Sequence, residues 1–270
     1  MKKINIVKKG KKHLSQSVFL FPSLFTIASM YCAFFSIASS VEGKLSRAAL
    51  YIGFSIILDG LDGRIARALN AHTEIGLQLD SLADIIAFGV APSILIYYWA
   101  FHPYYGGYYS KAGFLAAFLF LMCSAVRLAK FNIISTLTDK RFFIGLPTPA
   151  SAGVIAALVH YYPQPLKASY ASLTAIVLLI ILSFLMVSKI KYFSFKSINL
   201  RSQKSYFYII AIAVIIASIL TFSQIALISL ATIYLLSGII MRLFGLQQKQ
   251  PSPSAIIQEK KIGTPSSPHT

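Results

Sequence analysis

Five of the chain's eight acidic residues fall within residues 59–84, which read DGLDGRIARALNAHTEIGLQLDSLAD. Asp59 and Asp62 are three positions apart and Asp80 and Asp84 are four apart, so each pair lies on one face of a helix. The intervening NAHTEIGLQ is polar enough to contain a turn. We therefore expect two antiparallel helices that direct four carboxylates at one place.

Four carboxylates so close together repel one another, and a divalent cation removes that repulsion. Carboxylate oxygens suit Mg²⁺ or Mn²⁺, ions that also bind phosphate oxygens. Arg67 falls close to the face of the first aspartate pair, and a metal ion with an arginine is suited to a diphosphate. The small residues Gly63, Ala66 and Gly76 let a ligand or a second backbone approach. The alternatives are an ion pathway in a transporter, or carboxylates neutralised by Arg64 and Arg67.

The segments around this cluster have the composition of a membrane protein. The chain is 56% hydrophobic with a mean hydropathy of +0.69, and several apolar runs reach the about 20 residues that cross a bilayer. Long continuous runs favour helices over strands, so we expect an all-α integral membrane protein. About eight transmembrane helices are expected, near residues 17–40, 46–69, 82–101, 112–133, 147–162, 168–188, 205–222 and 224–244. The prolines in GLPTPASAG predict a broken or tilted start to the fifth helix, with a plain loop-to-helix start as the alternative.

The net charge of +17 is explained by membrane topology. Of the 25 basic residues, 21 lie in the N-terminal tail, near the connections after spans two, four and six, and on the C-terminal side. The positive-inside rule then places both termini and the acidic cluster on the cytoplasmic side of the cell (inner) membrane. Contact with anionic lipid head groups accounts for the remaining positive charge, and no nucleic-acid partner is expected.

Cysteine and histidine residues form no second site in the sequence. Cys32 and Cys123 lie in apolar runs, where they are expected as small buried hydrophobic residues rather than a disulfide or a metal pair. The basic start of the chain lacks the pattern of a cleavable signal peptide. No constellation is formed by His13, His102, His160 or His269.

The spacing within residues 59–84 resembles the signature of the CDP-alcohol phosphotransferase family. The resemblance is carried by eight positions at fixed intervals: Asp59, Asp62, Gly63, Ala66, Arg67, Gly76, Asp80 and Asp84. Four flanking segments resemble the bacterial phosphatidylserine synthase branch: FPSLFT (21–26), AFGVAPSIL (87–95), VRLAKFN (126–132) and FIGLPTPASAG (143–153). Two positions depart from the usual pattern, with Ser23 in place of Asn and Lys130 in place of Arg.

The resemblance implies an activity and an organisation of the chain. The implied reaction transfers the phosphatidyl group from CDP-diacylglycerol to L-serine and releases CMP, with Mg²⁺ or Mn²⁺ as cofactor and a homodimer as the assembly. The implied organisation is a six-helix catalytic core over 16–190 and two additional helices over 191–245. A basic cytoplasmic or interfacial tail over 1–15 and a Pro/Ser-rich disordered cytoplasmic tail over 246–270 complete the chain.

The resemblance also assigns residues to roles. Metal binding falls to Asp59, Asp62, Asp80 and Asp84, and Asp84 is also the proton acceptor. CDP-diacylglycerol binding falls to Ser23, Thr26, Gly63, Ala66, Arg67, Thr73 and Gly76.

The serine-binding residues are a separate hypothesis from position and chemistry. Candidates are Arg127, Asn132, Lys140 and Arg141, at the expected cytoplasmic level near the end of the fourth span. Their alternative is an ordinary helix-end or positive-inside charge and, for Arg127, pairing with a core aspartate.

Other functions remain open at this point. The signature handles the CDP half of the substrate, so the acceptor could be another alcohol such as glycerol 3-phosphate, inositol or choline. Membrane prenyl transfer also uses Asp-rich motifs with Mg²⁺, but there the motifs lie far apart along the chain. A transporter without chemistry is the third alternative.

Overall fold

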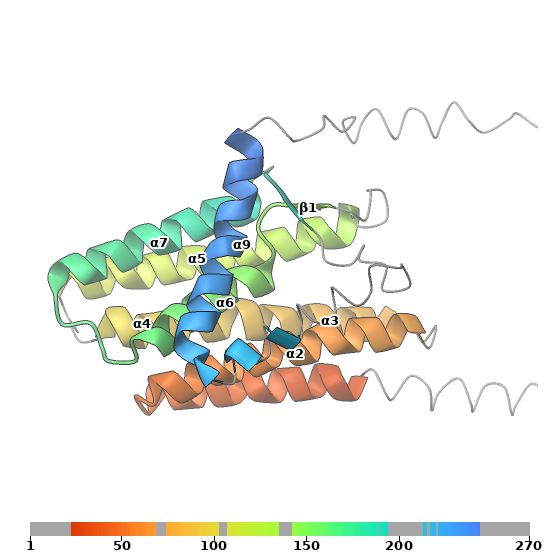
Figure 1. The fold of residues 1–270 in the computed structure, drawn as a ribbon, viewed down its shortest axis with the longest axis horizontal. Coiled ribbons are helices and arrows are strands. Elements are labelled where there is room, and N and C mark those ends of the chain that lie inside the picture. Colours follow the sequence, from red (N-terminus) through yellow and green to blue (C-terminus); the bar gives the residue numbers. More distant parts are fainter. Residues whose placement is uncertain are drawn as a thin grey trace, which may run out of the picture.

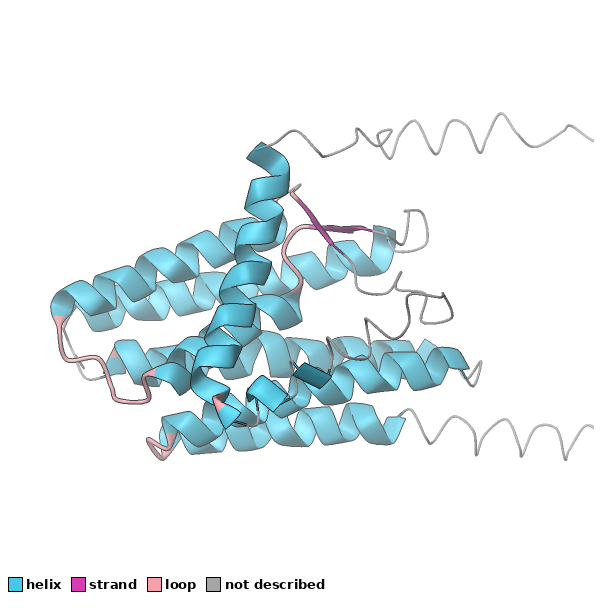
Figure 2. Ribbon diagram, viewed as in Figure 1, coloured by secondary structure: helices cyan, strands magenta, loops and turns pink. Residues whose placement is uncertain are grey.

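The computed structural model describes residues 23–68, 74–102, 107–134, 142–188, 190–193, 213–214, 217–219 and 221–243. Helices dominate these residues, as Figure 2 shows. They are the first helix (Ser23–Val41), α2 (Leu45–Ala68), α3 (Glu74–Ile85), the π-helical turn η1 (Ile86–Val90), α4 (Ala91–Ala100), α5 (Tyr108–Ile134), α6 (Thr148–Tyr161), α7 (Ser169–Val187) and α9 (Ser223–Leu243). The predicted tails over 1–15 and 246–270 lie outside the described residues.

The predicted fold class is confirmed, and most predicted spans have a helix within a few residues of their bounds. Within the described part of the chain, four helices are long and apolar enough to cross a membrane: Ser23–Val41, Ile75–Ala100, Tyr108–Asn132 and Ser169–Val187. The predicted span at 205–222 falls mostly outside the description, which includes only 213–214, 217–219 and 221–222 of it. The expected broken start of the fifth span is wrong, and the alternative of a plain loop-to-helix start is confirmed. The helix α6 begins directly after Pro147 and carries Pro149 in its first turn, where no backbone donor is needed.

Two three-residue strands lie between the apolar runs. β1 (Phe142–Ile144) pairs antiparallel with β2 (Lys191–Phe193), with Phe143 opposite Tyr192. Gly145, at φ +77°, then turns the chain toward α6, and its N–H donates to the Ile190 carbonyl over 2.8 Å. The small ladder therefore ties the start of α6 to the end of α7.

The helices form a bundle whose connections lie at two ends. The turn at 42–44, the end of α4 and the α6–α7 connection lie at one end, and the ends of α2 and α5 lie at the other, near the start of α3 (Figure 1). The turn at 42–44 carries an exposed ion pair between Lys44 and Glu42, which lowers the pKa of the Glu42 carboxyl. Successive connections therefore lie at alternating ends of the bundle, and those after the second and fourth predicted spans share one end, as the distribution of basic residues predicted.

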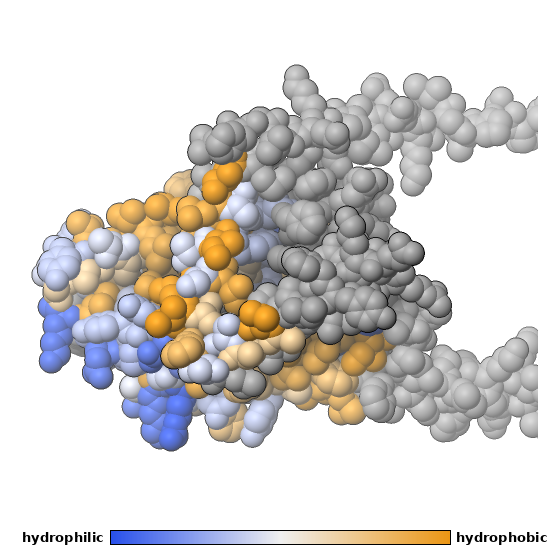
Figure 3. All heavy atoms as spheres, viewed as in Figure 1, coloured by the Kyte–Doolittle hydropathy of each residue, from blue (hydrophilic) through white to orange (hydrophobic). Residues whose placement is uncertain are grey.

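The outer and inner surfaces of the bundle differ as expected for a membrane protein. Large apolar side chains are exposed on the outer faces of α5 and α7, among them Phe114, Phe118, Val177 and Phe184. Hydrophobic residues cover much of the lateral surface in Figure 3, and hydrophilic residues gather near one end. The core is filled by apolar side chains and by many small residues, which let the helices pack closely.

Candidate active site

A seam of hydroxyl groups joins the first helix to α2. The Ser29 and Ser55 hydroxyls lie 2.7 Å apart, and the Ser36 hydroxyl donates to the Ala48 carbonyl over 2.9 Å. At the end of this seam, Thr26 Oγ1 donates to Asp62 Oδ2 over 3.0 Å. Hydrogen bonds of this kind hold helices in register within a bilayer. The seam therefore fixes the position of Asp62.

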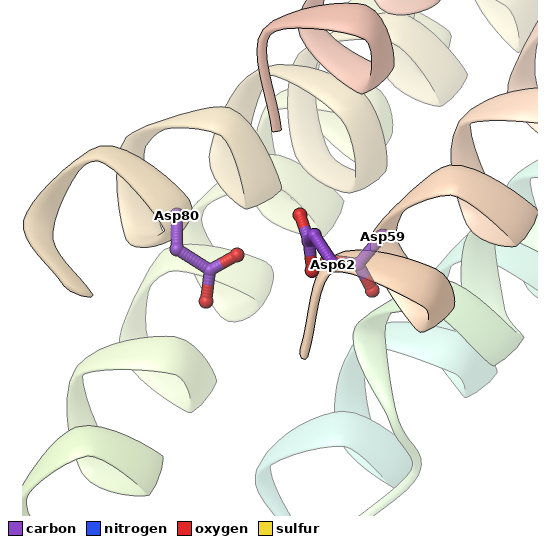
Figure 4. Close-up of side chains that lie close together, drawn as sticks. All are labelled: Asp59, Asp62 and Asp80. Carbon is purple, nitrogen blue, oxygen red and sulfur yellow. The ribbon is translucent and has the colours of Figure 1, made fainter. Parts of the chain in front are cut away.

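Three carboxylates meet where the ends of α2 and α3 face each other. Asp59 and Asp62 come from α2 and Asp80 comes from α3, and one oxygen of each lies within 4.8 Å of the others (Figure 4). Asp62 is only 4% exposed and also accepts a hydrogen bond from the Gly63 backbone. Three hard oxygen donors at this separation fit Mg²⁺ or Mn²⁺.

Asp84 stands beside this group, one helical turn after Asp80. It shares a hydrogen bond with Asp59 and lies close enough to Asp80 and Asp62 for electrostatic repulsion. The Asp84 carboxyl therefore lies directly beside that of Asp59. The predicted meeting of four carboxylates is thus observed as three in a tight group and a fourth next to them.

Arg127 is buried beside Asp84. This α5 residue is 7% exposed, interacts electrostatically with Asp84, and donates from Nη1 to Thr148 Oγ1 at 3.4 Å. Its guanidinium carbon lies 5.9 Å from the centre of the Phe131 ring. So buried a side chain does not extend its charge to water, which excludes the helix-end alternative, whereas the interaction with Asp84 agrees with the alternative of pairing with a core aspartate.

Asn132 reaches α3 between two of the aspartates. Its Nδ2 donates to Ser81 Oγ over 2.9 Å, which connects the end of α5 to the helix that carries Asp80 and Asp84. This contact makes Asn132 a positioning residue for α3.

The remaining predicted residues divide into three sets. Ser23 and Thr26 lie at the start of the first helix, Gly63 lies in α2 and Gly76 in α3. Ala66 and Arg67 belong to α2, and their side chains lie outside the description. Thr73, Lys140 and Arg141 lie wholly outside the described residues.

The structure connects Arg127 to Thr148 and Tyr234, and Tyr234 to Tyr192, three residues that were not predicted for the site from the sequence. Thr148 begins α6 and accepts the hydrogen bond from Arg127. Tyr192 is completely buried and stacks on Tyr234, with ring centres 5.8 Å apart. No local signal distinguishes these two tyrosines, because both lie beyond the motif segments.

The fold and the site together define a helical membrane protein with a cluster of carboxylates suited to a divalent cation. Residues 19–187 match the model of the CDP-alcohol phosphatidyltransferase family, and the chain belongs to this family.

Several relatives of the chain carry one curated name, CDP-diacylglycerol–serine O-phosphatidyltransferase. The protein of that name from Helicobacter pylori (strain ATCC 700392 / 26695) is 37% identical over 188 residues, which are 67% of this chain and 75% of the relative. The one from Bacillus subtilis (strain 168) is 36% identical over 65% of this chain and 90% of its own. The one from Methanocaldococcus jannaschii is 32% identical over 80% of this chain and 94% of its own.

Proposed function

We propose that this protein transfers the phosphatidyl group of CDP-diacylglycerol to the hydroxyl of L-serine and releases CMP. The observation that carries this proposal is the group formed by Asp59, Asp62 and Asp80 with Asp84 beside it, in a chain of the CDP-alcohol phosphatidyltransferase family. The acceptor is inferred from the relatives named for serine.

The residues of the site have distinct tasks in this reaction. A bound Mg²⁺ or Mn²⁺ neutralises diphosphate charge and makes CMP a better leaving group. Asp59, Asp62 and Asp80 would hold it, and the Thr26 hydroxyl keeps the Asp62 carboxylate in place. Asp84 contributes to a second ion and accepts the proton of the serine hydroxyl. The serine oxygen bonds to the phosphorus that bears the diacylglycerol, while the bond from that phosphorus to the CMP oxygen breaks.

Substrate binding is assigned to residues around the carboxylates. CDP-diacylglycerol contacts are proposed for Ser23, Thr26, Gly63, Ala66, Arg67, Thr73 and Gly76. Serine contacts are proposed for Arg127, Asn132, Lys140 and Arg141. Among these, Arg127 has the strongest support, because a buried guanidinium beside Asp84 would hold an amino-acid carboxylate close to the residue that takes the proton.

The lipid substrate is proposed to approach along α3. An open and mainly apolar hollow there is lined by Ile75, Leu77, Gln78, Leu79 and Leu82. The site faces the cytoplasm in this proposal, with both termini on the cytoplasmic side of the inner membrane and two chains forming a homodimer. Labelling of single cysteines in the connections tests the orientation, and light scattering in detergent tests the dimer.

The reaction is tested by incubating the purified protein in detergent with CDP-diacylglycerol, Mn²⁺ or Mg²⁺, and single alcohols. CMP release is expected with L-serine and is expected to cease when a chelator is added. Release with glycerol 3-phosphate, inositol or choline but not with serine would contradict the serine assignment. Glu42→Gln, in the exposed turn before α2 and far along that helix from the carboxylates, is a matched control that should keep full activity.

A further inference from the structure

The last described helix, α9, lies beyond the family region yet packs into the bundle. It contacts α6 and β2, and Figure 1 shows it crossing the other helices at a steep angle. At its start, the Ser223 hydroxyl lies 3.0 Å from His160 Nε2 on α6. Toward its end, Gly238 lies flat against the Tyr192 ring, and a Cβ at position 238 would overlap that ring. The family region itself stops at residue 187.

A row of polar side chains leads from the candidate active site to α9. Arg127 lies close enough to both Asp84 and Tyr234 for electrostatic interaction, and Tyr234 stands in the same relation to Tyr192. The Tyr192 and Tyr234 rings stack at an interplanar angle of 30°. The row thus contains one carboxylate, one guanidinium and two phenol groups, supplied by α3, α5, α9 and β2.

Two buried donors of this row have no hydrogen-bond partner among the described residues: Arg127 Nε and Tyr192 Oη. Their side chains are 7% and 0% exposed. Leaving such groups unpaired costs free energy. Two buried donors without a partner therefore indicate that a ligand or an ordered water binds there. Burial raises the pKa of the Tyr192 phenol, so its hydroxyl keeps its proton at neutral pH and can donate.

We propose that Arg127, Tyr192 and Tyr234 bind the carboxylate of the acceptor amino acid, so that the segment after the family region forms one wall of the acceptor site. This inference rests on the proposed function. The unpaired Nε of Arg127 and the unpaired hydroxyl of Tyr192 can each donate to an anionic ligand, and the guanidinium would repel a metal cation. Its position beside Asp84 suits the carboxylate of a small acceptor whose own hydroxyl must reach that aspartate.

The first test measures KM and kcat of Tyr192→Phe and Tyr234→Phe in detergent. Each change removes one oxygen and keeps the stacked ring. Loss of a hydrogen bond to a charged group predicts a KM for L-serine raised about tenfold or more, with the KM for CDP-diacylglycerol unchanged. Tyr170→Phe, at a position on α7 that is 77% exposed, is the matched control and should behave like the unaltered protein. A raised KM for CDP-diacylglycerol instead would assign the donors to the diphosphate and overturn the inference.

The second test compares L-serine with L-serinamide, which lacks the carboxylate. The unaltered protein should prefer serine. If the amide is turned over, its kcat/KM should be lower than that of serine, and if it is not, its inhibition constant should be higher than the KM for serine. Both Phe variants should lose about tenfold of that preference. If Tyr192 and Tyr234 had a purely structural role, both variants would bind serine and serinamide more weakly by the same factor and would have a lower thermal unfolding midpoint. That result would contradict the inference.

The two proposals fail in different ways. No serine-dependent CMP release from the unaltered protein would refute the proposed function. Normal serine turnover, with an unchanged serine KM and unchanged preference in both Phe variants, would refute only the role of Tyr192 and Tyr234.

Discussion

Thr26 Oγ1 donates a hydrogen bond to Asp62 Oδ2 over 3.0 Å, and both side chains are buried. The two residues are 36 positions apart in the sequence, so the bond joins the first helix to the cluster of carboxylates on α2 and α3. Because Asp62 is the most deeply buried member of the group, its orientation depends on this single hydroxyl and on the Gly63 backbone.

Replacing Thr26 with Val should therefore weaken metal use. The change keeps the shape and removes the donor, which costs about 1.5–3 kcal/mol when the acceptor is charged. We expect the Mn²⁺ concentration for half-maximal CMP release to rise about tenfold, whereas Thr26→Ser should stay near the unaltered value. An unchanged metal requirement in the Val variant would show that the hydroxyl does not position Asp62.

Asp80→Asn and Asp84→Asn should separate metal binding from proton transfer. Loss of a general base lowers kcat by about 10²–10⁴-fold. We expect that loss in Asp84→Asn with most of the Mn²⁺-induced rise in thermal unfolding midpoint retained, because Asp84 stands outside the tight group of three. Asp80→Asn should lose both activity and the Mn²⁺-induced rise. Equal loss of the Mn²⁺ response in both variants would make Asp84 chiefly a metal ligand.

The contact between Asn132 and Ser81 should act as one unit. Asn132→Ala and Ser81→Ala each break the bond that holds α5 to α3, so the double variant should be no worse than either single change. A coupling of about 0.5–1.5 kcal/mol in kcat/KM is expected from a double-mutant cycle. A rise in serine KM confined to Asn132→Ala would instead indicate direct contact between Asn132 and the acceptor.

Gly145→Ala should destabilise the protein. Gly145 has a φ of +77°, which costs a residue with a side chain about 1–2 kcal/mol, and a Cβ there would overlap the Met186 carbonyl oxygen. We expect a lower thermal unfolding midpoint in detergent. Gly53→Ala is the matched control, because its Cβ would meet open space within a helix and should leave the midpoint equal or higher.

His160→Phe should loosen α9. His160 lies 3.2 Å from Ser46 Oγ through Nδ1 and 3.0 Å from Ser223 Oγ through Nε2, so it bridges α2 and α9. Losing both bonds should cost about 1–3 kcal/mol, seen as a lower unfolding midpoint and faster proteolysis at α9. The same change at the exposed His102 should have little effect, and a stable His160→Phe variant would argue against the bridge.

The local features of this protein could be predicted from the sequence because they depend on neighbours along the chain. The apolar runs predicted the bounds of the helices to within a few residues, because an apolar run must be covered by a bilayer or by the protein core. The spacing of Asp59 with Asp62, and of Asp80 with Asp84, placed each pair on one helix face. The effect of Pro147 and Pro149 could not be predicted from the sequence, because proline in a first turn starts a helix as readily as it breaks one.

The sequence by itself determined the helical membrane fold and the carboxylates of the candidate site, because helix periodicity and motif spacing are local properties. Only the tertiary structure decided that Asp84 stands beside the group of three, that Arg127 is buried next to it, and that Tyr192 meets Tyr234. These relationships join residues from different helices and strands. They depend on how side chains pack between elements, and that packing leaves no periodic signal along the chain.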